Sequence, residues 1–471
     1  MMQRIGVAVV KKLHNIREQI IAFATFGLGA GLAFGLYSDL RALAISVAGV
    51  GVYVVTIVID PLRGLVLWLV TQPLLERYLN ISLGAGIPDL SLSRLCLALV
   101  SLFLLARTAV GYRRMRPFNR FDLLAFLWMV GMMQAGARGL YGINSMQSTF
   151  DLYCIPILVY FAVKNLVTSQ QSVRLVLFAV LIVAVYSAIY AFYESTTGNV
   201  LFAPPASDKH AFRFYTDSGL RILRGIWQSN TNFGRVFVMA IPILFYFYLK
   251  APSSFRKIFF AICLVLVLGG LYLTYKRAAW LAMIVVVVVM QFFYPQFRRL
   301  SIVLLIVAGA ASVLNWDRIS DSAVYTDRIN SQYSTSEART QGWEHALEFW
   351  SASPLVGHGF QQYRNLARAA GYRDQAIESE HLEILVSAGL AGFLPYVGML
   401  LSMGYDGLQH YRGQVSGSLI DRDLVAVFWG VLVGYVVTLA TSVISDLMIS
   451  SLLLAVAGAV IYSRAPSLKG T

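Results

Sequence analysis

Residues 257–294 read KIFFAICLVLVLGGLYLTYKRAAWLAMIVVVVVMQFFY and hold two apolar runs, 257–275 and 278–294, with only a short polar break between them. A helix needs about 20 mostly apolar residues to cross a membrane, and about 17 is the lower limit. Both runs reach that limit, so the stretch predicts two membrane-spanning helices joined with almost no loop. The break carries Lys276 and Arg277, which places two cations at a membrane surface.

The whole chain has the same apolar character. Of its 471 residues, 58% are hydrophobic and only 13% are charged, whereas soluble domains have roughly 45–50% and about 25%. A soluble fold would lack the charge to cover its surface, and a disordered chain would contain fewer apolar residues. The composition therefore predicts an all-α, polytopic integral membrane protein.

Fourteen apolar runs are candidate spans, and several are short or interrupted, so we expect 12–14 transmembrane helices. The runs lie near residues 20–36, 41–59, 62–79, 92–110, 121–137, 150–168, 173–194, 233–250, 257–275, 278–294, 299–315, 381–404, 423–443 and 447–463.

The net charge of +14 comes from Lys and Arg, whose distribution among the loops indicates how the chain is oriented in the membrane. With the N-terminus inside, the loops that carry Arg113, Arg256, Arg298 and Arg412 all fall on the cytoplasmic side, so both termini are predicted to be cytoplasmic. Many other basic residues lie outside, more than orientation requires. We expect some of these to form salt bridges or to bind an anionic ligand, and we expect no nucleic-acid partner.

Three regions follow from these runs. Residues 1–315 are predicted to form transmembrane helices with an outer loop at 195–231, residues 316–380 a small helical loop domain outside the membrane, and residues 381–471 the last spans and a cytoplasmic tail. Within the loop domain, Glu337 to Trp350 has helical periodicity. The three cysteines each lie in an apolar run, which predicts neither a disulfide nor a metal site.

Two groups of arginines are candidate anion ligands at the outer surface. Arg277 lies in the polar break beside Lys276, where it either binds phosphate or extends toward lipid head groups. Arg221 and Arg224 precede the span at 233, in a segment where residues such as Asn232 favour a sharp turn. A solvated loop is the alternative for this pair.

His381 is the candidate base, because it lies where the large outer loop re-enters the membrane. Its unperturbed pKa near neutrality suits proton transfer, and Glu380 or Glu383 could orient the ring. A structural role is the alternative. The predicted topology places His381 and the arginines on one side of the membrane. Arginines and a histidine without an Asp-rich metal motif predict chemistry on a phosphate-bearing substrate that uses no metal, and we expect no cofactor.

Several short motifs resemble those of the bacterial O-antigen ligase and O-antigen polymerase superfamily. They are Thr274 to Trp280, Arg224-Gly225 through Gly234, Arg339-x3-Trp343-x2-Ala346, Pro354-Leu355-x-Gly357-x-Gly359 and His381-x3-Leu385-x3-Gly389-x2-Gly392. The chain departs from the usual pattern in having Leu382 after the histidine, Asn230-Thr231 in place of Pro-Asn, and Lys276 before the arginine.

The resemblance implies glycosyl transfer at the periplasmic face of the inner membrane. We expect an O-antigen ligase, which moves a glycan from undecaprenyl pyrophosphate to lipid A–core, with a polymerase or a protein O-oligosaccharyltransferase as alternatives. It implies that Arg277 and Arg224 (or Arg221) bind the pyrophosphate and that His381 activates the acceptor. Arg339 either binds the donor or braces the loop. An anion transporter that uses the same arginines is the rival from another class.

Overall fold

The computed structural model describes residues 41–76, 80–81, 89–111, 115–200, 222–293, 298, 335–372, 377–413, 419 and 421–463. The apolar runs 20–36 and 299–315, and Arg221, lie outside these residues. The other twelve runs each coincide with helix, which confirms the all-α class. The only strands in the described ranges, β1 (Asn80–Ile81) and β2 (Leu90–Ser91), form a short antiparallel pair with Asn80 opposite Ser91.

The described helices are α2 (Arg41–Ile59), α3 (Pro61–Leu75), α4 (Leu92–Ala109), α5 (Arg120–Ala137), α6 (Ile143–Thr149), the π-helix η1 (Phe150–Cys154), α7 (Ile155–Leu166), α8 (Gln170–Thr197), α9 (Asn230–Leu249), α10 (Ser254–Leu273), α11 (Arg277–Phe293), α15 (Thr335–Ala352), α16 (Tyr363–Ala369), α17 (Glu380–Tyr411), α18 (Arg422–Leu439) and α19 (Leu447–Val460).

Seven of the described helical segments are long and apolar enough to cross a membrane. Four shorter apolar helices, among them α3, α11 and α19, accompany them. The chain is therefore a multi-pass membrane protein. The seven segments are Leu92–Ala109, Ile143–Leu166, Gln170–Thr197, Asn230–Leu249, Ser254–Leu273, Glu380–Tyr411 and Arg422–Leu439.

The chain forms two compact units, the first from Met1–Arg116 with Asn165–Val167 and the second from Pro117–Lys164 with Thr168–Thr471. In the first unit, Asp60 caps α3 and Ser91 caps α4. The buried Trp68 donates from its indole nitrogen to the Ser93 hydroxyl at 3.1 Å, and that hydroxyl donates to Glu76 at 2.7 Å. These bonds join α3 to the start of α4.

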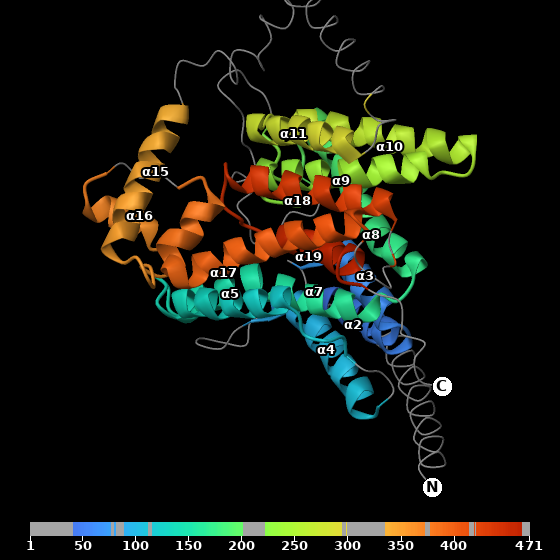
Figure 1. Cartoon of the computed structure of the whole chain (residues 1–471), viewed down its shortest axis with the longest axis horizontal. Helices are drawn as coiled ribbons and strands as arrows, with labels where there is room; N and C mark the ends of the chain where they lie inside the picture. Colours follow the sequence, from blue (N-terminus) through green and yellow to red (C-terminus); the bar gives the residue numbers. More distant parts are fainter. Residues whose placement is uncertain are drawn as a thin grey trace, which may run out of the picture. The chain divides into compact units, whose positions relative to one another are not determined.

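The second unit is a helical bundle built around α9 and α19. Every residue of α19 is buried. In α9, every residue from Asn232 to Tyr246 is buried. α17 packs along α5, α11 along α18, and α10 along α9, as Figure 1 shows. α10 exposes large apolar side chains such as Phe255, Ile262 and Val265, which is the pattern of a helix that faces lipid.

Polar N-caps define where the bundle helices begin. Asn119 and Asp122 form a capping box at α5, Ser229 caps α9, Ser253 caps α10, and Asp421 caps α18. Each cap accepts a hydrogen bond from a backbone N–H that would otherwise lack a partner. The sequence thus places Ser, Asn or Asp immediately before each of these apolar runs.

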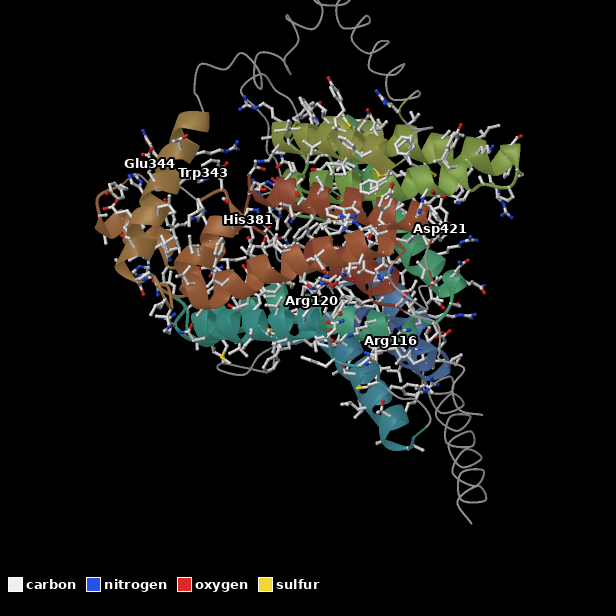
Figure 2. All side chains as sticks on the ribbon, in the orientation of Figure 1. Arg116, Arg120, Trp343, Glu344, His381 and Asp421 are labelled. Carbon is white, nitrogen blue, oxygen red and sulfur yellow. The ribbon has the colours of Figure 1, made fainter. Side chains whose placement is uncertain are left out.

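The two ends of the bundle carry different labelled residues. Figure 2 shows Trp343, Glu344 and His381 toward the left of the view and Asp421 toward the right, with Arg120 between them. Two ion pairs, Arg120 with Asp406 and Lys250 with Asp423, involve residues of the predicted cytoplasmic end. The predicted topology assigns the Arg120 end to the cytoplasm and the His381 end to the outside.

Candidate functional site

α17 is broken at Gly389, and the break positions the segment that bears His381. Gly389 has a φ of +61° and a ψ of −161°, which interrupts the helix. Gly357 faces it, and a methyl group on Gly389 would lie 2.6 Å from the backbone nitrogen of Gly357. Only residues without a side chain permit this approach. Gly357 and Gly389, which come from two of the sequence motifs, therefore allow the loop at residues 354–359 to pack directly on α17.

The backbone groups that the break exposes are paired with this loop. The N–H groups of His358 and Gly359 donate to the carbonyls of Val386 and Ser387 at 2.8 and 2.9 Å. In the reverse direction, the N–H of Leu390 donates to the Pro354 carbonyl at 2.9 Å. Residues 354–359 thus hold the first turns of α17, from Glu380 to Ala388, in a fixed position.

His381 lies at the start of α17 and is partly buried. Its Nδ1 forms a hydrogen bond of 3.0 Å with the hydroxyl of Tyr396, which lies beyond the break. Tyr396 is only 1% exposed, so its ring cannot readily move. Tyr396 and the backbone of Val436, which also bonds to the ring, fix the orientation of the imidazole.

The two glutamates that flank His381 bond to other groups. Glu380 is fully buried; it accepts from the Tyr153 hydroxyl at 2.8 Å and from the Ile444 N–H at 2.7 Å. Glu383 accepts from the Ser387 hydroxyl at 3.0 Å. Neither carboxylate bonds to the imidazole, so the expectation that one of them orients His381 is replaced by the contact with Tyr396.

The segment after α18 links the start of α17 to the start of α9. Ile444 donates to Glu380, and Ser445 accepts from the Asn232 side-chain amide at 3.0 Å. The Asn232 carbonyl oxygen in turn accepts from Arg235 at 3.2 Å. Residues 442–445 therefore bond to Glu380, the residue before His381, and to Asn232 and Arg235 at the start of α9.

The polar break between α10 and α11 also meets the start of α9. The Asn230 amide donates to the Thr274 carbonyl at 3.1 Å. Arg277 begins α11 and is exposed, whereas Lys276 is partly buried. The structure thus brings Lys276 and Arg277 to the same end of the bundle as α9's first residues.

The arginine-bearing turn before α9 is held by a buried glutamate. Glu194, which is fully buried in α8, accepts from the Arg224 backbone N–H at 3.2 Å. The Arg224 side chain donates to the Gln228 carbonyl at 3.2 Å. Gly225 follows with a φ of +22°. Arg224 is therefore placed in an ordered turn, while Arg221 lies outside the described residues.

Arg339 lies in α15 and forms an ion pair with Glu378, immediately before α17. Ala346 of the same helix is buried against Tyr363, Ala367 and Val386. The helix that the periodicity predicts over Glu337 to Trp350 is thus present as α15, and it packs on the start of α17 (Figure 1). This geometry agrees with the bracing alternative for Arg339.

A small pocket opens where α9, α11 and α18 meet at this end, and its cavity volume is about 10 Å³. It is lined by Thr231, Arg235, Lys276, Ala278, Ala279, Thr438, Thr441 and Ser442. No three His, Cys, Asp or Glu side chains in the described ranges are grouped to hold a metal ion. That the reaction needs no metal stays a prediction.

Sequence reasoning missed Arg235, Tyr396 and Tyr153. A signal for Arg235 was present, because a cation three residues into the run 233–250 is costly in a membrane and marks a site. The two tyrosines gave no such signal, since tyrosines are frequent in this chain and their partners are distant in sequence.

The fold and these contacts define a polytopic, all-α membrane protein with basic and titratable groups gathered at one end of a helical bundle. Residues 262–397 match the family model described as O-antigen ligase, from α10 to the middle of α17. This match supports the resemblance to the O-antigen ligase and polymerase superfamily over these residues. No curated protein matches the chain.

Proposed function

We propose that this protein is an O-antigen ligase in the bacterial inner membrane. It transfers a glycan from undecaprenyl pyrophosphate to a sugar hydroxyl of lipid A–core at the periplasmic face. The observation that carries the proposal is the bonded path from Glu380 through residues 442–445 to Asn232. This path connects the start of α17, which bears His381, to the start of α9. Arg224 lies in the turn just before α9, and the break with Lys276 and Arg277 contacts Asn230 of α9 through Thr274.

His381 is the proposed general base. This role requires the tautomer with its hydrogen on Nδ1, which donates to Tyr396 and leaves the Nε2 lone pair for the acceptor's proton. The ring also bonds to the backbone of Val436, so that contact must open on the Nε2 side when the acceptor binds. The acceptor oxygen bonds to the anomeric carbon of the donor sugar as the bond from that carbon to the pyrophosphate oxygen breaks. The proton moves to the imidazole, and the electron pair leaves on the pyrophosphate.

Arg277 and Arg224 are the proposed ligands of that leaving group. Negative charge grows on the pyrophosphate as the glycosidic bond breaks, and cations held in place beforehand stabilise it. The planar guanidinium matches two phosphate oxygens at once. Arg277 is exposed at the start of α11, where a lipid-borne diphosphate can reach it.

The test uses cells that lack their own ligase and express single variants. In His381→Ala cells we expect at least about 100-fold less glycan on lipid A–core, because a general base contributes about 10²–10⁴-fold. Arg277→Ala should act in the same direction, and lipid-linked glycan should accumulate in both. Lys250→Gln, which removes a cation that is ion-paired at the opposite end, is the control for charge and for membrane abundance. Normal glycan-capped lipid in both site variants would contradict the proposal.

A further inference from the structure

Trp128 of α5 is buried beside the candidate site, and its indole nitrogen makes no hydrogen bond. The side chain is 1% exposed, and its Nε1 has no partner among the described residues. A buried donor without a partner is costly, and such groups are few in native proteins. The contacts of the ring show what this residue does in place of hydrogen bonding.

Two tyrosines pack against the ring of Trp128. Its centroid lies 5.5 Å from that of Tyr153 in a T-shaped contact and 5.4 Å from that of Tyr396 in a tilted one. Both distances fall in the range of favourable aromatic pairs. Tyr153 donates to Glu380, and Tyr396 bonds to His381. One indole therefore packs on the hydrogen-bond partners of the first two residues of α17.

These partners lie on both sides of the break in α17. Glu380 and His381 precede Gly389, and Tyr396 follows it. Because the left-handed residue interrupts the helix, the helical backbone alone does not fix the distance from His381 to Tyr396. Trp128 packs on Tyr396 beyond the break and reaches Glu380 before the break through its tyrosine partner. A single side chain of α5 thereby links the two parts of α17.

Two backbone features bring these rings together. Tyr153 lies in the π-helix η1, and such turns are frequent at functional sites. α5 and α17 approach each other closely at Gly131 and Gly392, since a methyl group on Gly131 would lie 2.8 Å from the Cα of Gly392. Gly131 is one turn from Trp128, and Gly392 is one turn from Tyr396. The close approach of the two helices thus allows the two rings to meet.

We propose that Trp128 is a positioning residue for His381. It holds Tyr396 where the hydroxyl meets Nδ1 of the imidazole, and it holds Tyr153 where the hydroxyl meets Glu380. It acts through these two tyrosines and does not contact the substrate. The role rests on the proposed function, in which His381 is the base. Trp128 and Tyr153 lie outside residues 262–397, so the family match does not indicate either of them.

The experiment uses full-length protein in nanodiscs and two independent measurements. The first is the rate at which diethyl pyrocarbonate modifies His381, followed by mass spectrometry of the peptide that contains it, and it needs no glycan transfer. The second is kcat and the KM for the donor. The variants are Trp128→Leu, which removes the ring, and Trp128→Phe, which keeps a smaller one. Trp429→Phe is the matched control, because its indole nitrogen is also buried without a partner among the described residues, and its ring packs on Phe293 and Phe428 instead.

We expect Trp128→Leu to raise the modification rate about 3-fold or more, because an imidazole with a less fixed partner is more accessible. It should lower kcat by about 3- to 10-fold, which is the size of one lost aromatic pair, and leave the KM for the donor unchanged. Trp128→Phe should act in the same direction by about 2-fold, and Trp429→Phe should have no effect. A higher KM with an unchanged kcat would overturn the positioning role.

Combination with Tyr396→Phe tests whether Trp128 acts through the tyrosine. Residues that act on one another give effects that do not multiply, so kcat of Trp128→Phe combined with Tyr396→Phe should fall by less than the product of the two single effects. A fall equal to that product would overturn the positioning role.

The two measurements separate this role from the proposed function. Faster modification of His381 in the Trp128 variants of a protein that never transfers glycan would support the positioning contacts and contradict the ligase assignment. Transfer by the unaltered protein, with unchanged His381 modification and kcat in both Trp128 variants, would overturn the positioning role and leave the ligase assignment standing.

Discussion

Lys164 and Arg235 are both buried basic side chains of the second unit, and their charges are satisfied in different ways. Lys164, near the end of α7, forms an ion pair with Asp122 and donates to the Pro117 carbonyl at 3.3 Å. Asp122 also accepts from the Tyr160 hydroxyl at 2.7 Å. Arg235, near the start of α9, has only neutral acceptors.

The difference extends to the ends of the bundle at which these residues lie. At the Lys164 end, further cations have carboxylate partners, such as Arg120 with Asp406 and Lys250 with Asp423. The hydrogen bond with Asp423 raises the pKa of Lys250 and keeps it charged. The buried carboxylate of the other end, Glu380, is bonded to Tyr153 and Ile444 instead of to a cation. Buried charge at the first end is neutralised by a carboxylate, whereas the buried Arg235 at the second end has neutral acceptors, and the ion pair there, Arg339 with Glu378, is partly exposed.

Removing the carboxylate of Asp122 should have the largest effect on folding. Asp122→Ala leaves Lys164 buried without a counter-ion and destroys the capping box of α5. Loss of one partner from a buried ion pair costs about 3–5 kcal/mol, so we expect a clear drop in the thermal midpoint in detergent. Lys250→Gln, which breaks an exposed pair, is the comparison. If Asp122→Ala had the same thermal midpoint as the unaltered protein, the ion pair with Lys164 would not stabilise the fold, and the contrast with Arg235 would be lost.

Gly389→Ala should disturb the site through the backbone. Its left-handed φ costs a residue with a side chain about 1–3 kcal/mol, and the added methyl group would lie 2.5 Å from the Leu355 carbonyl carbon. Gly371→Ala is a matched control, since Gly371 has a φ of +78° with no atom within 4 Å of the added group. We expect glycan transfer to fall at least about 10-fold in Gly389→Ala only, as His381 moves with its helix. Equal activity in both variants would show that the break does not position the base.

Tyr396→Phe should lower the rate of transfer without unfolding the protein. It removes one hydrogen bond to His381, which is worth about 1 kcal/mol or roughly 5-fold in kcat. The pH profile of kcat should shift as well, because the imidazole loses a partner. Tyr462→Phe is the control: this buried hydroxyl donates to Asp406 at 2.9 Å, beside the ion pair of Arg120. An unchanged kcat and pH profile in Tyr396→Phe would argue against His381 as the base.

Arg339→Gln should have the smallest effect, because its ion pair with Glu378 is partly exposed. The side chains are 27% and 42% exposed, and such pairs contribute about 0–1 kcal/mol. We expect a small loss of thermal stability and less than a 3-fold change in the KM for the donor. A rise of 10-fold or more in that KM would assign Arg339 to donor binding instead of to bracing.

The sequence predicted the long apolar helices of the described residues, and it predicted which polar side chains lie at their ends. His381, Lys276 and Arg277 fall at such boundaries, and α15 follows its periodicity. The break in α17 was not predictable, because the left-handed turn at Gly389 depends on a loop more than twenty residues earlier in the chain. Residues 442–445 carry no motif, and their role comes only from the long-range contacts of Glu380, Asn232 and Arg235.

The most direct measurement is reconstitution of the purified protein with lipid-linked glycan, in the presence and in the absence of lipid A–core. The account predicts that glycan is joined to lipid A–core, that nothing elongates without it, and that the product falls at least about 100-fold in His381→Ala. Chain growth on lipid-linked glycan without lipid A–core, or full product from His381→Ala, would contradict it.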